Sequence, residues 1–587
     1  MKTSAFQVIL VSTLFLSISS ATAQPVKFKR LLPGPVDEFL SSIVETENGY
    51  MICGGTMNNG LRSILLIRTD QYGNVLWRKY INKNNHNCFE GAANAMVRTA
   101  DGGYAIAGTL INPDSGMRSA WLVKLDAEGD TMWTRKYRTD TVYIGAYQCK
   151  QTSDNGYALV GATDTTGNNV DMLMVKTDSL GEMEWYSTYG GNKTDAGFKI
   201  IQSFDNGYVL CGFTLSYGSG SSPQDWYIVK TDSAGNQQWY KTFGSPTEED
   251  GGARGVTMLH DSCFVFTGAY SLGYDGDSYF KAKIVKTNSG GTVIWDKEYE
   301  GTWGVDPYPE NVYLYFYSVI EQDDGSLLST AIAKDYYGWL DTRLFKFGSQ
   351  GDTIWTRHYR AVDTTVVPMA EYLFVLHNTS DGGVIMAGMG ESDWLMSPHN
   401  QIWIVKTDCN GFESPPVAGF SVTVDENNVT LALHSEFADS CIVNLGDGTE
   451  IHCAADSTPL FHSYQDTGTY TILLTAYSSC DMADADTAEQ QVIITSVGAD
   501  HLHRNLLNPK IFPNPANGKI HIYLPPDKQD VRIDVFTPDG KILFSEKLHS
   551  PHSTLDLIGI DDGICFLRFT FSEGVVSKKI VKISSLL

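Results

Sequence analysis

The sequence predicts an all-β protein, and three observations carry this prediction. The chain contains 12% aromatic residues and 55 glycines among its 587 residues, a composition that favours strands joined by tight turns. A segment of about 56 residues recurs between residues 24 and 413. Within each copy, short apolar runs alternate with Asn, Asp and Gly. Strands packed in sheets are therefore expected throughout.

Two motifs define the repeat. The first is a turn followed by a strand, as in residues 154–157 (Asp-Asn-Gly-Tyr). The second is an apolar strand, a turn with Asp and Gly, and then Trp, as in Asp178, Gly181 and Trp185. A Trp at one fixed position per repeat indicates packing in the core. The copies of the first motif end at Tyr50, Tyr104, Tyr157, Tyr208, Phe264, Leu327 and Val384.

Each repeat divides into four predicted strands. In the third repeat these strands are residues 146–151, 157–161, 172–176 and 184–189. Four strands in each of about seven repeats predict a seven-bladed β-propeller. The seventh repeat lacks its fourth strand, and residues 26–31 resemble residues 133–137, so we expect the N-terminal strand to close the ring. An open β-solenoid, or six or eight blades, are the alternatives.

The predicted strand order sorts the loops onto two faces. One face has short, repetitive turns, whereas the other has long, dissimilar connections, where binding sites usually lie. These long loops are residues 215–224, 270–279, 335–341 and 390–400. Aromatic residues gather there, and flat aromatic rings suit carbohydrate ligands, although they also pack against each other. The candidate ligand-binding residues are Tyr270, Tyr274, Trp303, Tyr336, Tyr337, Trp339 and Trp394, with Tyr308 nearby.

Carboxylates recur where the chain enters the predicted innermost strands. They are Asp37, Glu38, Glu90, Asp195, Glu249, Asp250, Glu310 and Glu371. A ring of carboxylates at the mouth of a propeller is suited to Ca²⁺ or to a sugar hydroxyl, and acidic capping of strand ends is the alternative. The sequence leaves metal ligands unknown.

Composition and motifs narrow the function classes. The net charge of −25, from 43 Lys and Arg against 68 Asp and Glu, argues against a nucleic-acid partner. The repeats contain none of the usual linear catalytic motifs, so no catalytic residue is assigned. A polysaccharide hydrolase or lyase remains the alternative, with Glu249 or Asp250 paired to Glu310 as acid and base.

The N-terminus has the pattern of a secretory signal. Residues 1–23 combine a cationic start, a short apolar stretch and a small-residue end at Ala23. No other run approaches the ~18 apolar residues of a membrane helix, so we expect no transmembrane segment. Among ten cysteines, Cys441, Cys453 and Cys480 lie close enough in sequence to include a bridge, while Cys53 and Cys211 are expected to be buried.

Residues 415–496 form a separate module after the repeats. They contain residues 444–449 (Asn-Leu-Gly-Asp-Gly-Thr) and a strand that begins Gly-Thr-Tyr at Gly468. This pattern resembles the polycystic-kidney-disease-type (PKD-like) immunoglobulin-fold domain, which implies a small β-sandwich that acts as a spacer or adhesion unit. Residues 497–508 are the expected linker to the last module.

Residues 509–587 contain an early Pro-Asn-Pro segment, two glycine turns and a late pair of lysines. These motifs resemble the type IX secretion C-terminal sorting domain of Bacteroidota. The resemblance implies recognition by the type IX secretion machinery after passage through the periplasm. Alternating apolar and polar residues independently predict a β-sandwich. The motif residues are Pro513, Asn514, Pro515, Gly518, Gly540, Gly563, Lys578 and Lys579.

Together these features predict a secreted or cell-surface binding or adhesion protein. Its propeller face would bind an extracellular carbohydrate or a surface protein, and its C-terminal domain would direct export. No cofactor follows from the sequence beyond a possible Ca²⁺ ion.

Overall fold

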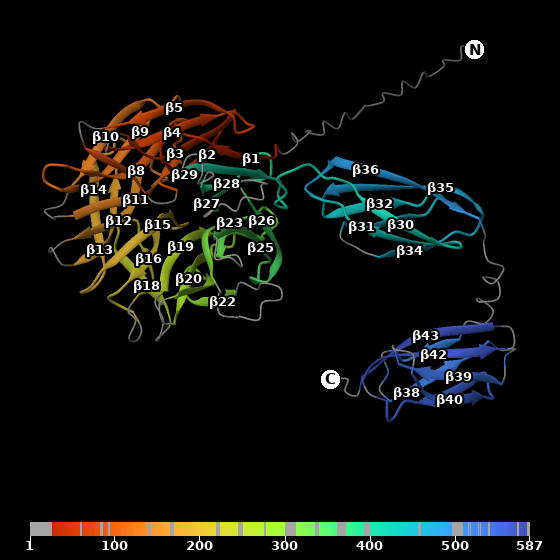
Figure 1. The fold of residues 1–587 in the computed structure, drawn as a ribbon. Helices are drawn as coiled ribbons and strands as arrows, with labels where there is room; N and C mark the ends of the chain where they lie inside the picture. The colour runs from red at the N-terminus through yellow and green to blue at the C-terminus, as the bar shows by residue number, and fades with distance from the viewer. Residues whose placement is uncertain are drawn as a thin grey trace, which may run out of the picture. The chain divides into compact units, whose positions relative to one another are not determined.

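The fold is described from a computed structural model (Figure 1). The structure describes residues 26–583 apart from 59–60, 83–85, 92–93, 139–142, 165–168, 219–223, 245–249, 275–276, 300–312, 335–339, 361–370, 392–399, 456–458, 496–508, 515, 517, 526–527, 529, 538–540, 561 and 572–573. Every regular element in these residues is a β-strand, which confirms the all-β prediction. No helix capable of crossing a bilayer is found among them.

The described part of the repeat region contains seven antiparallel sheets. Six of them each come from one continuous repeat, and the second has five strands because its inner strand is interrupted. Their strands are β2–β5 (Glu38–Thr46, Gly49–Asn58, Leu61–Thr69, Val75–Ile81), β6–β10 (Asn87–Glu90, Met96–Arg98, Tyr104–Ile111, Arg118–Leu125, Thr131–Tyr137), β11–β14 (Tyr143–Gln151, Tyr157–Asp164, Val170–Thr177, Met183–Tyr189), β15–β18 (Asp195–Gln202, Tyr208–Thr214, Asp225–Thr231, Gln237–Phe243), β19–β22 (Asp250–Met258, Phe264–Tyr274, Asp277–Thr287, Val293–Tyr299) and β23–β26 (Leu314–Glu321, Leu327–Lys334, Leu340–Phe347, Thr353–Tyr359).

The remaining sheet joins the two ends of the repeat region. It has the order β1-β29-β28-β27, with β1 at Phe28–Leu32 and the other strands at Asn400–Thr407, Val384–Glu391 and Glu371–Asn378. β1 runs antiparallel to β29, with Phe28 opposite Lys406 and Leu32 opposite Ile402. In Figure 1 the red β1 accordingly lies beside the teal strands of the last repeat.

Apolar clusters fill the space between neighbouring sheets. Six clusters each combine side chains of two sheets that are consecutive in sequence. A seventh combines the first sheet with the last, where Leu40 and Ile67 meet Val375 and Ile404. Cys53 and Cys211 are fully buried in two of these clusters, as predicted. The core of this region is thus a series of inter-sheet layers.

A repeated ion pair supports the tight turns of six repeats. A lysine near the end of the third strand, buried in five repeats and half-buried in one, contacts an aspartate in the turn between the first and second strands. In the first repeat Arg68 takes this position and donates to the Thr46 hydroxyl. The pairs are Lys124–Asp101 (2.8 Å), Lys176–Asp154 (2.8 Å), Lys230–Asp205 (2.7 Å), Lys286–Asp261 (2.8 Å), Lys346–Asp324 (3.1 Å) and Lys406–Asp381 (3.0 Å).

The aspartates of these pairs are held in their ionised form. Burial alone would raise the pKa of Asp154, but hydrogen bonds from Lys176 and from the Thr152 hydroxyl outweigh burial and lower its pKa to about 2. The same balance lowers the pKa of Asp101 to about 2. Each buried lysine therefore faces a charged partner at neutral pH.

A second repeated contact joins consecutive repeats through a turn glycine. Gly181, in the turn between β13 and β14, has φ +76°, a conformation that favours glycine. A Cβ atom at this position would lie only 2.5 Å from the Trp133 ring of the preceding repeat. The carbonyl of Gly181 also accepts a hydrogen bond of 2.8 Å from the Tyr137 hydroxyl. The repeating Trp residues are thus half-buried packing partners of the next turn.

The residues after Pro416 form four further sheets. Two of them share one apolar core around Cys441, Leu474 and Ile494. The other two enclose a core around Ile520, Val535 and Phe569. Their strands are β30, β31 and β34 (Phe420–Asp425, Asn428–Leu433, Leu460–Ser463), β33, β32, β35 and β36 (Glu450–Ala454, Ser440–Asn444, Gly468–Ser478, Asp481–Ile494), β37, β38 and β41 (Lys510–Phe512, Lys519–Tyr523, His552–Asp556), and β40, β39, β42 and β43 (Ile542–Leu548, Val531–Phe536, Gly563–Phe571, Gly574–Lys582).

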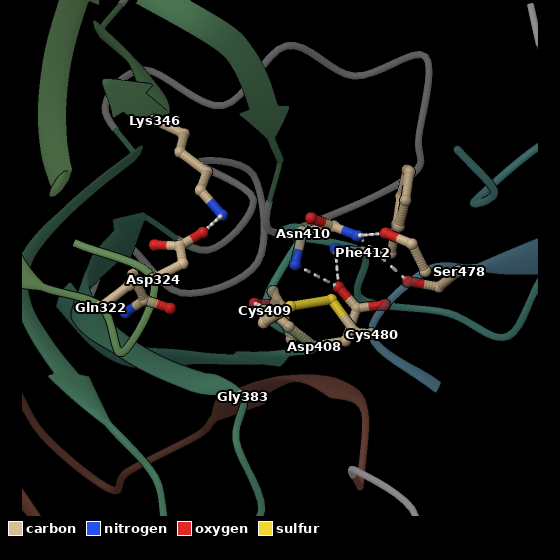
Figure 2. Close-up of a disulfide and its surroundings, with 12 residues drawn as sticks. Gln322, Asp324, Lys346, Gly383, Asp408, Cys409, Asn410, Phe412, Ser478 and Cys480 are labelled. Carbon is tan, nitrogen blue, oxygen red and sulfur yellow. Dashed lines mark hydrogen bonds and ion pairs between the residues drawn. A yellow bond between two sulfur atoms is a disulfide. The ribbon is translucent and has the colours of Figure 1, made fainter. Parts of the chain in front are cut away.

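Two disulfides are present among the described cysteines. Cys441–Cys453 joins β32 to β33 and confirms that a bridge forms in this segment. Cys409–Cys480 was not anticipated from the sequence; it fastens residues 477–485 to the end of the last repeat, and the two form part of one compact unit (Figure 2). Lys27, just before β1, contacts both Asp408 (3.3 Å) and Asp484 (2.7 Å) beside this disulfide.

The structure corrects one predicted loop. Residues 270–279 are not an irregular connection, because β20 and β21 continue as a paired hairpin from Tyr270 opposite Lys281 to Tyr274 opposite Asp277. Tyr270, Tyr274 and Tyr279 favour strand structure, which accounts for the extension. The four strands predicted in the third repeat all fall within β11 to β14.

The buried lysine pairs predict an asymmetry between two conservative substitutions. Asp205→Asn is expected to lower the free energy of unfolding of the repeat region by about 2–3 kcal/mol, because Lys230 stays buried without its charged partner. All 12 tryptophans lie in the repeat region, so chemical denaturation followed by tryptophan fluorescence reports on it alone.

The matched control is Asp130→Asn. Asp130 forms a 2.6 Å ion pair with Lys79 in which the aspartate is mostly exposed. Its loss is expected to cost less than about 1 kcal/mol. If both variants lose the same free energy of unfolding, the buried ion pair contributes no more to stability than the exposed one, which contradicts the prediction.

Candidate functional site

The strand register separates two ends of each sheet in the repeat region. At one end lie the tight Asp-containing turns with their lysine pairs. At the other end the first strand of each sheet begins and the second strand ends, as Asp195 of β15 and Thr214 of β16 show by lying opposite each other. The long connections leave from this end, which we call the loop end.

Most of the predicted aromatic ligand-binding residues lie outside the described residues. These are Trp303, Tyr336, Tyr337, Trp339 and Trp394. Tyr274 is described by its backbone, in β20. The Tyr270 hydroxyl donates a 2.5 Å hydrogen bond to Oε2 of Glu298, which joins two strands of the same sheet.

The predicted carboxylates have different surroundings. Glu249 and Glu310 lie outside the described residues, and Asp250 is placed only by its backbone, at the start of β19. Glu38 is buried, with Oε1 3.5 Å from Nε of Arg78, and burial raises its pKa. Among the described residues, no group of three or more Asp, Glu, His or Cys side chains is arranged to hold a metal ion.

Asp195 organises the loop end of the fourth sheet. One carboxylate oxygen accepts a hydrogen bond from the Thr214 hydroxyl, and the other accepts from the Ser216 hydroxyl (2.6 Å) and from the amide of Gly191 (2.8 Å). Asp195 is fully buried. Its role is therefore to fix the connection after β14 against the connection after β16.

A second carboxylate, Asp171, lies beside Asp195. A Cβ atom on Gly190 would lie 2.3 Å from Oδ1 of Asp171 and 2.6 Å from Oδ2 of Asp195, so the two oxygens flank the same small space. Burial and the charges of Asp195 and Asp164 raise the pKa of Asp171 to about 6. Two carboxylates that differ in their environment are a typical arrangement for acid–base chemistry.

Exposed tyrosines border this carboxylate pair. The Tyr217 hydroxyl donates to the carbonyl of Gly190 (2.5 Å), and its ring centroid lies 5.1 Å from that of Tyr240. Tyr217 is 38% exposed and Tyr240 is 44% exposed. An exposed aromatic surface beside carboxylates is suited to a sugar ring, with the apolar face on the tyrosines and the hydroxyls on the acids.

Sequence reasoning identified Asp195 but missed its partners. Asp171 lies near the start of the third strand of its repeat, and Asp225 and Asp341 occupy similar positions in later repeats. This recurrence was visible in the sequence. The pairing of Asp171 with Asp195 was not, because the two carboxylates come from adjacent sheets.

The sorting motif is partly described and partly outside the described residues. Asn514 contacts β43 twice: its Nδ2 donates to the carbonyl of Lys579 (3.1 Å), and its Oδ1 accepts from the amide of Val581 (2.9 Å). The first and last motif segments therefore lie side by side. Pro513 and Lys579 are exposed, Lys578 is half-buried, Gly518 and Gly563 have positive φ values of 82° and 142°, and Pro515 and Gly540 lie outside the described residues.

Comparison with protein families identifies the C-terminal module. Residues 510–583 match the family described as secretion system C-terminal sorting domain. The chain therefore carries a type IX secretion sorting domain, which indicates export through that system to the cell surface or beyond. No curated protein matches the chain significantly.

Solved structures resemble the chain at low sequence identity. A protein of unknown function from Dyadobacter fermentans is 9% identical over 65% of this chain and 98% of its own, with a TM-score of 0.36. The β-propeller domain of the trilobed protease from Pyrococcus furiosus is 11% identical over 64% and 95%, with a TM-score of 0.36. PorZ, a surface component of the type IX secretion system of Porphyromonas gingivalis, is 10% identical over 95% and 100%, with a TM-score of 0.15.

The raised pKa of Asp171 predicts a pH-dependent cost to stability. Because the folded-state pKa is about 6 and the ordinary value is 3.8, the cost is absent below pH 3.8, grows between pH 3.8 and pH 6, and is constant above pH 6. Asp171→Asn should stabilise the repeat region at pH 7 by about 1 kcal/mol, since the carboxyl group is partly open to water, and should have no effect near pH 3.5.

Thermal unfolding followed by tryptophan fluorescence across this pH range measures the effect. Asp323→Asn, which changes an exposed carboxylate in the turn between β23 and β24, is the control and should show no such dependence. If Asp171→Asn instead destabilises the protein at pH 7, the negative charges of Asp171 and Asp195 do not lower the stability of the folded state.

Proposed function

We propose that the seven sheets are the blades of a closed β-propeller and that its loop end is the binding face of a secreted or cell-surface protein. The sorting domain indicates that the protein is exported. Closure would hold the loops of the first and last repeats on one rigid ring, which a binding face assembled from several repeats requires.

The equivalence of β1 to a fourth strand supports closure. In the third repeat, the turn glycine Gly181 packs against Trp133 and Arg135 of the preceding fourth strand. In the first repeat, Gly73 packs in the same way against Phe28 and Arg30 of β1. Phe28 thus takes the place that Trp occupies elsewhere, and the inter-sheet cluster of the first and last sheets continues the series.

The proposed ligand is an extracellular carbohydrate, and the observation that carries this proposal is the carboxylate and tyrosine cluster at the loop end. Asp171 is half-buried and offers an acceptor for hydroxyl groups, and the buried Asp195 fixes the loop connections beside it. Tyr217 and Tyr240 offer an exposed aromatic surface. The predicted residues Tyr274, Trp303, Tyr336, Tyr337, Trp339 and Trp394 would extend this surface from other repeats. A surface protein remains the alternative partner.

Two further modules belong to the same proposal. Residues 1–23 would act as the signal peptide for passage to the periplasm. Residues 415–496 would act as a PKD-like spacer, and the positive φ of Gly446 (80°) and Gly448 (90°) in the Gly-Asp-Gly turn supports this reading.

A second candidate function is a polysaccharide hydrolase or lyase. The observation that favours it is the close approach of Asp171 to Asp195, together with a pKa of about 6 for Asp171, which suits a general acid near neutral pH. Glu249, Asp250 and Glu310 are the alternative carboxylates for the same chemistry.

Glycan binding predicts a specific effect of Tyr217→Ala. The full chain is expected to retain particular polysaccharides on a glycan array, and Tyr217→Ala should weaken retention about tenfold because one stacking surface is lost. Tyr186→Ala, which removes an exposed tyrosine from β14, is the matched control and should bind like the unmodified chain. Trp339→Ala and Trp394→Ala test the other predicted loops.

The same panel separates binding from catalysis. Release of soluble sugar that disappears in Asp171→Asn would establish the hydrolase or lyase. Retention without release would establish the binding protein. If neither the unmodified chain nor its variants retain any glycan, the carbohydrate proposal fails.

A further inference from the structure

A cavity of about 160 Å³ lies among the innermost strands of the repeat region. A single water needs on the order of 10–15 Å³ by a comparable measure, so this cavity admits a ligand of several atoms. Five innermost strands, β11, β15, β19, β23 and β27, line it together with Asn94, which precedes β7. Residues from six of the seven repeats therefore line this cavity.

Basic side chains converge on this cavity. Lys150 of β11, Lys199 of β15 and His377 of β27 line it. Burial and the charges of Lys150 and Lys199 lower the pKa of His377 to about 3, so the imidazole is neutral. Burial, followed by the charges of Lys150 and Arg254, lowers the pKa of Lys199 to about 7.

Arg254 adds to this positive charge from β19. It occupies the extra residue of a β-bulge between Ala253 and Gly255, and Gly255 lines the cavity. Its guanidinium lies 4.0 Å from the ring centroid of Phe198, and Nε donates to the Tyr315 hydroxyl at 3.1 Å. These contacts hold the side chain in place without neutralising its charge.

Lys150 differs from the buried lysines that support the tight turns. Six repeats pair such a lysine with an aspartate at 2.7 to 3.1 Å. Lys150 forms no ion pair with any carboxylate in the part of the chain that the structure describes, although the protein as a whole carries a net charge of −25. Burial disfavours the charged form of Lys150, and an anion bound in the cavity would offset this desolvation cost.

Neutral polar groups complete the lining. Asn94, Gln148 and Ser318 line the same cavity. Nε2 of His377 and Oδ1 of Asn94 form a hydrogen bond of 2.9 Å, and Oε1 of Gln148 accepts one of 2.6 Å from the amide of Ile200. The side-chain amide nitrogens of Asn94 and Gln148 are donors suited to the remaining oxygens of a small anion, whereas the Ser318 hydroxyl donates to the carbonyl of Phe374 (2.7 Å).

We propose that the central cavity of the repeat region binds a small oxyanion through Lys150 and Lys199, with Arg254 adding positive potential. The shared chemistry is that of phosphate, a sulfate group or a carboxylate. The proposal is independent of the carbohydrate site, because the cavity lies on the turn side of the bulges whereas Asp171 and Asp195 lie at the loop end.

Isothermal titration calorimetry of the full chain tests the proposal. The probes are inorganic phosphate, sulfate, acetate and glucuronate, each titrated at matched ionic strength against chloride. We expect saturable binding of one anion per chain for at least one probe, and the preferred probe identifies the source of the oxyanion. At pH 8 binding should take up protons, because an anion raises the pKa of Lys199, and titrations in two buffers of different ionisation enthalpy measure this uptake.

Variants locate the site. Lys150→Met and Lys199→Met should each weaken anion binding about tenfold, since each removes a charge-assisted contact. Lys241→Met removes an exposed lysine from β18 and should leave binding unchanged. Absence of saturable binding with all four probes, or binding that survives in both cavity variants, would overturn the proposal.

Discussion

The pairing of β1 with β29 is the contact on which the organisation of the repeat region depends. A sheet whose last strand is missing would expose the backbone groups of β29, and such edges invite association with other chains. β1 covers that edge over five residue pairs, and Phe28 and Leu32 enter the cluster between the first and last sheets. Lys27 and the Cys409–Cys480 disulfide lie beside this junction, so strand pairing, ion pairing and a covalent bond act at one place.

The two ends of the sheets differ in how regular their contacts are. At the turn end, the lysine and aspartate pairs and the contacts between glycine and tryptophan recur almost unchanged, which fixes each sheet to the next. At the loop end, the connections between strands differ from one repeat to the next. Asp195 accepts hydrogen bonds from two of these connections and so holds them together. The regular contacts at the turn end can therefore hold the variable loops of the other end in place, as rigid scaffolds commonly do for binding loops.

The sequence predicted the strands and their grouping because turn residues and apolar runs recur with a fixed period. It also pointed to residues 26–31 as the strand that completes the last sheet. It did not reveal the lysine and aspartate pairs, because a lysine near a strand end is expected to be exposed, and only the fold shows that Lys230 is buried against Asp205. The Cys409–Cys480 bridge was equally hidden, since the spacing of cysteines does not determine their partners. The cationic cavity is a further case: Lys150 and Lys199 lie in different sheets, and their proximity follows from tertiary structure alone.

Hydrogen–deuterium exchange at residues 26–34 of the full chain is the most direct test of whether β1 completes the last sheet. If β1 completes the last sheet, the amides of β1 that bond to β29 should exchange as slowly as those of the inner strands, at least about a thousandfold slower than in an unstructured peptide. Exchange of these amides within seconds, while β28 and β29 remain protected, would contradict the closing role of β1.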